Sequence, residues 1–132
     1  MSLKVTIIPK STYLHAIVEG LNSIENVKGY FEQIVKECTA RNCFRLLVEE
    51  RLEGPRLGTM EVFDLISSGS SRFLGMFKDV AFVDVNRAGD LMQFAETVAS
   101  NRGFPLTVFS TVPEAEVWLQ RTTGSGQHDA LR

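Results

Sequence analysis

The sequence contains few of the residues that build metal centres and disulfide frameworks. Its 132 residues include two cysteines, Cys38 and Cys43, and two histidines, His15 and His128. The cysteines do not form a CxxC pair, and a structural zinc site needs four cysteine or histidine ligands. Each cysteine falls in an apolar part of a predicted element, where a free thiol packs as a small hydrophobic group. We therefore predict no metal, no cofactor and no disulfide.

An excess of one charge and long apolar runs are also missing. The chain has 14 Lys and Arg against 16 Asp and Glu, a formal net charge of −2, and its basic residues are scattered. This balance predicts no binding to nucleic acid or to an anionic membrane surface. No apolar run approaches the roughly 18 residues of a membrane span. The amino terminus, MSLKVTIIPK, lacks the apolar core and cleavage site of a signal peptide. We expect a cytoplasmic protein without an integral membrane segment.

The apolar pattern changes repeatedly between strand and helix periodicity. Strand patterns cover residues 3–8, 13–19, 44–48, 80–85 and 106–109. Helical patterns cover residues 23–38, 59–66, 91–99 and 112–120. The first two strands are close enough to form an antiparallel hairpin, and strand–helix alternation with right-handed crossovers adds the others in parallel. The predicted fold class is α/β, with a mixed, mostly parallel five-stranded sheet and four helices.

A single domain accounts for most of the chain, since domains commonly contain about 100 to 150 residues. We expect it to span residues 1–121. Residues 122–132, TTGSGQHDALR, are polar and contain glycine, which is typical of a flexible C-terminal tail.

Two helix starts carry the sequence signature of a capping box. Asn22 precedes Glu25 by three residues before the first helix, and Thr111 precedes Glu114 by three before the last. In such a box the two side chains satisfy backbone N–H groups that the first turn leaves unpaired. We therefore expect both helices to begin at these positions.

The order and spacing of four segments resemble the STAS domain (sulfate transporter and anti-sigma-factor antagonist). They are "YLHAIVEG", "RLLVEE", "DVAFVDV" and "LTVFSTVPEAEVWL". The likeness covers about residues 3–120 and is greater to the bacterial single-domain proteins similar to anti-sigma-factor antagonists. It implies a STAS-type fold and a non-enzymatic regulatory or protein-interaction module, with a protein partner and a homodimer as one form of assembly.

The STAS resemblance directs attention to Thr59. In switchable members, a loop ending in Asp-Ser-Ser/Thr-Gly starts the second helix, and a partner kinase phosphorylates the first serine. The matching stretch here is "LGTME", with Gly58 at the aspartate position, Thr59 at the serine, and Met60 and Glu61 after it. Because only the hydroxyl is kept, we do not expect the usual phospho-switch. The favoured interpretation makes Thr59 the N-cap, whose loss should cost about 1 kcal/mol.

Several polar residues follow parallel strands and should share one edge of the sheet. They are Arg51, Arg56, Asn86, Arg87, Ser110 and Thr111. Three arginines at one edge could receive an anion or an acidic partner. Asp84, near the carboxyl end of a strand, belongs to the same edge, either as the acid of a hydrolase or as an acceptor for backbone N–H groups. Glu49 and Glu50 are neighbours on a strand, so they should point to opposite faces.

The apolar segment RFLGMFKDV leaves two interpretations open. It places four large side chains after the second helix: Phe73, Leu74, Met76 and Phe77. They either close the core or form a patch for a partner or an apolar ligand. The preceding serines, Ser67 to Ser71, predict a loosened helix end that could open a cleft near this helix.

Three functions follow in order of preference. The first is the STAS-like regulatory or protein-interaction module. The second is a carrier or sensor that binds a small apolar ligand or lipid in the cleft near the second helix. The third, and least favoured, is a hydrolase.

Overall fold

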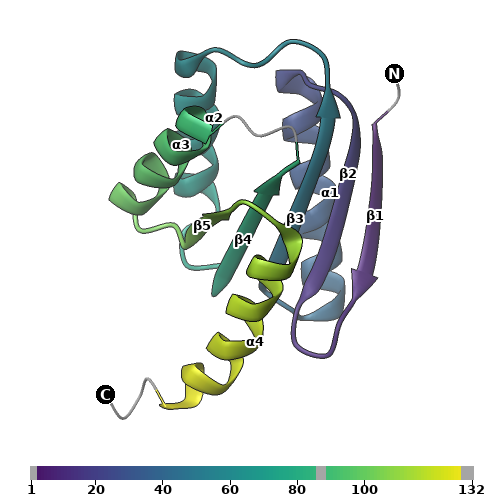
Figure 1. Ribbon diagram of the computed structural model, residues 1–132, viewed down its shortest axis with the longest axis vertical. Coiled ribbons are helices and arrows are strands. Elements are labelled where there is room, and N and C mark those ends of the chain that lie inside the picture. The colour runs from purple at the N-terminus through teal and green to yellow at the C-terminus, as the bar shows by residue number, and fades with distance from the viewer. Residues whose placement is uncertain (1–2, 86–88, 129–132) are drawn as a thin grey trace.

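The computed structural model describes residues 3–85 and 89–128 of the chain (Figure 1). The strands are β1 (Lys4–Pro9), β2 (Leu14–Leu21), β3 (Arg45–Glu53), β4 (Asp79–Asp84) and β5 (Leu106–Phe109). The helices are α1 (Ile24–Arg41), α2 (Thr59–Arg72), α3 (Gly89–Asn101) and α4 (Val112–His128). This order is the one that the apolar periodicity predicts, so the α/β fold class is confirmed.

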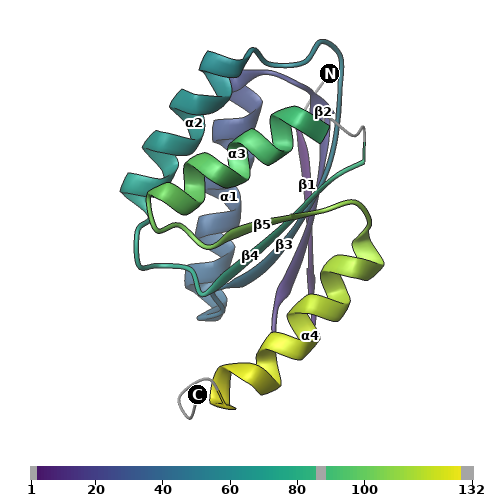
Figure 2. The ribbon, with the colours of Figure 1, turned by 60° about the vertical axis from the view of Figure 1, so that its left-hand side comes forward.

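All five strands form one mixed sheet in the order β1-β2-β3-β4-β5. The first pair is antiparallel and the remaining three pairs are parallel, as predicted. The strand β3 lies at the centre, and its residues 46–50 are buried. Helices α1, α2 and α3 lie on one face of the sheet and α4 on the other (Figure 2).

Alternation along β3 distributes its side chains between the two layers. Leu46 and Val48 join the larger core cluster, with residues of β1, β2 and α1. Leu47 joins the smaller cluster with Ala115 and Leu119 of α4. The same alternation places the Glu50 side chain on the face covered by α1 and the Glu49 side chain on the face of α4, because successive strand residues point to opposite faces. The two carboxylates therefore face different environments, as expected.

Thr111 caps the last helix, but Glu114 accepts from the Thr111 hydroxyl rather than from its backbone N–H, so only half of the predicted capping box forms, and Asn22 does not cap the first helix. Thr111 Oγ1 accepts from the backbone N–H of Glu114 at 3.3 Å and donates to the Glu114 carboxylate at 3.2 Å. The first helix is instead capped by Ser23, whose Oγ accepts from the N–H of Asn26 at 3.1 Å. The prediction of Asn22 as cap is therefore wrong by one residue, because a serine next to it supplies the same acceptor.

The last helix also continues beyond its predicted end. Helix α4 runs to His128, so the backbone of residues 122–128, assigned to a tail, is helical. The other residues assigned to that tail, 129–132, lie outside the described residues. The composition of TTGSGQH is a weak guide here because helix propensities differ by about 1 kcal/mol or less per residue.

Helix α2 differs from prediction at both ends. Its N-cap is Gly58, and the Gly58 N–H donates to Glu61 Oε1 at 2.7 Å. Thr59 is the first helical residue rather than the residue before it, so its assignment as the N-cap is wrong. At the other end, the helix continues through Ser67 to Ser71 as far as Arg72, so the predicted loosening is also wrong.

Candidate functional site

The backbone of helix α2 packs mainly against the neighbouring helices. Helix α1 packs on β1 and β2, and α3 packs on β5, whereas the close backbone contacts of α2 are with α3 and α1. A cavity of about 410 Å³ lies among the sheet and these three helices. Volumes of about 300 to 1,000 Å³ are usual for small-molecule sites. The arrangement of α2 therefore creates a space large enough for a ligand.

The walls of this cavity are mainly apolar. The sheet and α2 contribute the following side chains: Val48, Phe82, Val108, Val62, Leu65 and Ile66. Helix α3 lines a further side with Leu91, Met92 and Ala95. Phe73 and Phe104 line the cavity beside Val80, the second residue of β4. The cavity extends along β4 from Val80 to Asp84. These residues are four positions apart, which is about 13 Å at the usual rise per strand residue.

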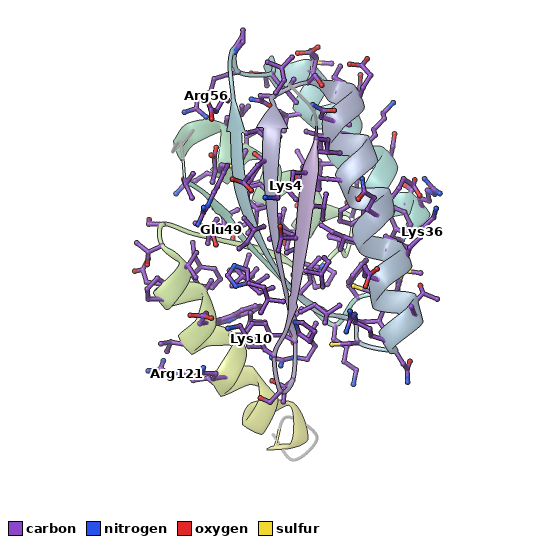
Figure 3. All side chains as sticks on the ribbon, turned by 90° about the vertical axis from the view of Figure 1, so that its right-hand side faces the viewer. Lys4, Lys10, Lys36, Glu49, Arg56 and Arg121 are labelled. Carbon is purple, nitrogen blue, oxygen red and sulfur yellow. The ribbon has the colours of Figure 1, made fainter. Side chains whose placement is uncertain are left out.

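The polar groups gather where β3 and β4 reach their carboxyl ends. Glu50 and Asp84 are register partners on these strands, and both line the cavity. The Tyr30 hydroxyl of α1 donates to Glu50 Oε2 at 2.6 Å. Arg56, from the loop after β3, places Nη1 3.2 Å from Asp84 Oδ2. Figure 3 shows Arg56 at the end of the sheet opposite Lys10 of the β1–β2 turn. The cavity thus has a buried acidic end, and most of its remaining wall is apolar.

Burial dominates the electrostatics of this polar end. It raises the pKa of Glu50 to about 7, an effect that the Tyr30 hydrogen bond opposes, Asp84 reinforces and Arg56 opposes. Burial also raises the pKa of the Tyr30 hydroxyl well above its ordinary value, with a further contribution from Glu50. Tyr30 therefore stays neutral, while Glu50 changes its charge near neutral pH.

The cavity reaches the surface between α1 and α2. Ser68 and Arg72 of α2 and Lys28 of α1 line it and are exposed. The Arg72 guanidinium forms an ion pair with the Glu32 carboxylate of α1, with Nη2 3.2 Å from Oε1. Both side chains are substantially exposed, at 62% and 44%. An exposed pair of this kind contributes about 0 to 1 kcal/mol, so it can open without a large cost.

One polar group on α2 is buried against the cavity without a partner. Ser70 lines the cavity and is 2% exposed, and its Oγ has no hydrogen-bond partner among the described residues. Gly69 beside it also lines the cavity, and a Cβ added at Gly69 would meet no atom within 4 Å. A buried hydroxyl without a partner is uncommon because it loses its hydrogen bonds to water. These two residues mark an underpacked stretch of α2.

A second buried polar group lies on the opposite face of the sheet. His15 Nε2 lies 2.8 Å from Glu49 Oε1, and Arg51 Nε donates to Glu49 Oε2 at 2.7 Å. Figure 3 shows Glu49 on the side of the sheet that α4 partly covers. Each oxygen of Glu49 therefore has a partner, which is how a buried carboxylate is ordinarily stabilised.

The residues predicted at the carboxyl edge do not form one cluster. Arg51 belongs to β3 and pairs with Glu49, whereas Arg56 pairs with Asp84 on the other face. Thr111 caps α4, and Ser110 is exposed before it. Asn86 and Arg87 lie outside the described residues. The expected convergence of Arg51 with Arg56 is wrong because β3 extends past Arg51, so strand alternation fixes its direction.

The apolar segment after α2 belongs to the core rather than to a surface patch. Phe73 and Phe77 are 8% and 6% exposed, and Met76 packs against the same cluster. The Phe77 ring centroid lies 5.9 Å from that of Phe31 and 6.0 Å from that of Phe104. Leu74 alone is exposed, at 61%. A cavity lies near α2, and of these four residues Phe73 lines it whereas Leu74, Met76 and Phe77 do not.

Three residues of the site were missed by sequence reasoning: Tyr30, Glu50 and Ser70. Tyr30 lies on the apolar face of the first predicted helix, where it resembles an ordinary core residue. Glu50 offered a usable signal, because it shares the parity of Leu46 and Val48 and so had to face the larger core. Nothing in the sequence marks Ser70, which stands among other serines.

Comparisons with known proteins identify no family for this chain. No protein-family model matches the sequence. No curated protein matches it either. Within residues 3–85 and 89–128, no group of three or more His, Cys, Asp or Glu side chains has a metal-binding arrangement. In the same part of the chain, no helix is both long and apolar enough to cross a membrane.

Proposed function

We propose that this protein is a carrier or sensor that binds a small, largely apolar ligand in the cavity beneath α2. The observation that carries the proposal is the cavity of about 410 Å³, with apolar walls and one polar end. Such a combination is usual for ligand sites, in which apolar walls supply affinity and a few polar groups orient the ligand.

The apolar character of the cavity walls supports this proposal. Water gains little in an apolar space that offers it few hydrogen bonds. An apolar ligand is therefore the occupant that suits these walls.

The expected affinity is moderate. Apolar burial contributes about 25 cal/mol per Å², so a ligand that buries a few hundred Å² gains roughly 5 to 10 kcal/mol. Lost freedom of motion opposes binding by several kcal/mol. At least about 4 kcal/mol of opposing cost leaves at most about 6 kcal/mol, which corresponds to dissociation constants of tens of micromolar or weaker.

Titration with the neutral dye phenyl-naphthylamine tests the proposal. Its fluorescence should rise on binding to the purified protein, and Ser70→Leu should weaken that binding about tenfold or more by filling the cavity. Ser71→Leu is the matched control, because Ser71 is exposed on the same helix and does not line the cavity. Circular dichroism establishes that both variants fold.

The proposal fails if Ser70→Leu and Ser71→Leu bind the dye equally well. It also fails if the parent protein gives no dye signal and native mass spectrometry finds no bound small molecule. A bound compound recovered from protein purified from its native cells would identify the ligand directly.

We propose a second candidate function, the STAS-like protein-interaction module, on the observation of one exposed apolar residue. Met60 is 68% exposed in the first turn of α2, next to the exposed Thr59. The STAS resemblance puts the partner-dependent switch at this turn. Photocrosslinking from position 60 in native cells should capture a specific protein, and Met60→Asp should reduce pull-down of that protein. Capture that is equal from position 74, where Leu74 is similarly exposed, would contradict the assignment.

A further inference from the structure

The buried carboxylate at the polar end of the cavity has no ion-pair partner among the described residues. Glu50 is 9% exposed, and its side-chain hydrogen bond comes from the neutral Tyr30 hydroxyl at 2.6 Å. Arg56 forms its ion pair with Asp84 instead. Buried charges are ordinarily paired with an opposite charge, because desolvation otherwise costs several kcal/mol. The position opposite Glu50 is therefore suited to a cation.

The register of the sheet places a second carboxylate beside the first. Glu50 on β3 pairs with Asp84 on β4, so the two side chains emerge next to each other on the face that lines the cavity. A ligand carboxylate placed here would meet the Glu50 carboxylate, which has no ion-pair partner among the described residues, beside the Asp84–Arg56 ion pair, and like charges are unfavourable at short range in a buried site. A ligand alcohol would gain hydrogen bonds without compensating any charge. A cationic group gains hydrogen bonds and also compensates the negative charge.

A separate polar group lies against the cavity, on helix α2. Ser70, on α2, is buried against the cavity with its Oγ unpartnered among the described residues. Val80 and Phe104 also line the cavity, whereas Glu50 and Asp84 lie toward the carboxyl ends of the strands. The cavity thus has an acidic end and an apolar part. The apolar part extends from the acidic end over a length of about four residues along the strand.

We propose that the ligand carries an ammonium group on its apolar body, and that Glu50, with Asp84 and the Tyr30 hydroxyl, receives that group. The ligand class is therefore an amphiphilic amine. This inference rests on the proposed function, because it names the chemistry of the ligand that the cavity binds. The apolar body lies against the walls from α2, α3 and the sheet, and the amine lies at the carboxyl ends of β3 and β4.

The pH dependence of binding follows from the groups that face Glu50. They are Tyr30 from α1, Asp84 from β4 and Arg56 from the loop after β3. Since the pKa of Glu50 is raised to about 7, its carboxylate becomes available as the pH rises through neutrality. An alkylammonium ion keeps its charge over this range, because amine pKa values lie near 10. Its affinity should therefore increase from pH 6 to pH 8.

Three probes with the same alkyl chain test the head group. Decylamine, decanol and decanoate are titrated into the purified protein below their aggregation concentrations, by displacement of bound phenyl-naphthylamine. Decylamine should bind about tenfold tighter than decanol or better, as expected for a charge-assisted hydrogen bond. Decanoate should bind more weakly than decanol. Only decylamine should gain affinity from pH 6 to pH 8.

Two variants test whether the preference for decylamine depends on the carboxylates at the acidic end of the cavity. Glu50→Gln should remove most of the advantage of decylamine over decanol and the pH dependence of that advantage. Asp84→Asn should reduce the same advantage and provides an independent variant. Glu53→Gln is the matched control, because it removes one carboxylate from the same strand at an exposed position outside the cavity. It should leave all three affinities unchanged.

The outcomes separate this inference from the proposed function. If decanol and decanoate bind as tightly as decylamine, the cavity binds apolar ligands and the amine assignment is wrong. The same conclusion follows if Glu50→Gln leaves the preference for decylamine intact. If none of the three probes displaces the dye, and the dye itself does not bind, both the inference and the proposed function are wrong.

Discussion

Glu50 and Asp84 lie side by side in the register of β3 and β4, and both carboxyl groups face the cavity. The central position of β3 is responsible for this relationship, because helices cover both of its faces and its polar residues become buried with the apolar ones. The buried Glu50 carboxylate accepts a hydrogen bond from the neutral Tyr30 hydroxyl. Its protonation therefore connects the stability of the fold with the chemistry of the site.

Stability should depend on pH through Glu50. Burial raises its pKa from 4.5 to about 7, so the folded protein binds this proton more tightly than the unfolded chain does. The resulting stabilisation is fully present below pH 4.5 and is lost as the pH rises through about 7. Glu50→Gln should therefore be more stable than the parent at pH 8, by up to about 3 kcal/mol, and nearly equal to it near pH 4.5. Urea denaturation at both pH values measures this difference, and a Glu50→Gln variant that is less stable at pH 8 would contradict it.

Ser70→Ala should stabilise the protein more than Ser68→Ala does. Both changes raise helix propensity by about 0.5 kcal/mol, since both positions lie within α2. Only Ser70→Ala also removes a buried hydroxyl without a partner, which costs about 1 to 3 kcal/mol. Ser68 is exposed and serves as the control. Equal melting temperatures for the two variants would show that the Ser70 hydroxyl is satisfied in solution.

The start of α2 should depend on Glu61 rather than on Thr59. Glu61 Oε1 accepts the N–H of the N-cap residue Gly58 at 2.7 Å, whereas Thr59 is the first helical residue. Glu61→Ala should therefore cost about 0.5 to 1 kcal/mol, through the lost bond and the helix dipole. Thr59→Ala should change stability by less than about 0.5 kcal/mol. Chemical denaturation of the two variants decides the matter, and the reverse order would restore Thr59 as the cap.

Phe77→Ala should destabilise the fold strongly, while Leu74→Ala should not. Phe77 is 6% exposed and contacts the rings of Phe31, Phe44 and Phe104. Removal of a buried phenylalanine typically costs about 3 to 5 kcal/mol. Leu74 is 61% exposed, so its truncation should change stability by less than about 0.5 kcal/mol. Thermal melts of both variants test this, and a small loss for Phe77→Ala would mean that the segment is not core.

The two thiols should differ in reactivity in the folded protein. Cys38 is fully buried, and burial raises its pKa to about 12, whereas Cys43 is only partly buried. A maleimide should therefore label Cys43 first, and Cys38 only after unfolding, since the thiolate is the reactive form. Cys43→Ser and Cys38→Ser, each labelled with and without denaturant, assign the two rates. Rapid labelling of native Cys43→Ser would contradict the burial of Cys38.

The element order could be read from the sequence because it follows local periodicity. Apolar residues at alternate positions predicted the strands, and those at helical spacing predicted the helices, with one hairpin and then parallel crossovers. Helix ends were less predictable. Ser23 and Asn22 offer similar side-chain oxygens as N-caps, and Gly58 and Thr59 are both acceptable N-cap residues. The free energies of the alternative caps differ by about 1 kcal/mol or less, so the tertiary structure decides between them. The end of α2 was equally hard to predict from local sequence, because the helix continues through five serine-rich residues that were expected to loosen it.

The sequence by itself determined the α/β order, the central place of β3 and the opposite directions of Glu49 and Glu50, because these depend on patterns within single elements. Only the tertiary structure decided that the backbone of α2 packs mainly against α3 and α1 and that a cavity of about 410 Å³ lies among these helices and the sheet. It also decided that Tyr30, Glu50 and Asp84 meet at one end of that cavity. These residues come from three elements, 20 or more positions apart, and no local pattern records how far one layer of helices lies above the sheet. That distance is a result of packing among all the side chains at once.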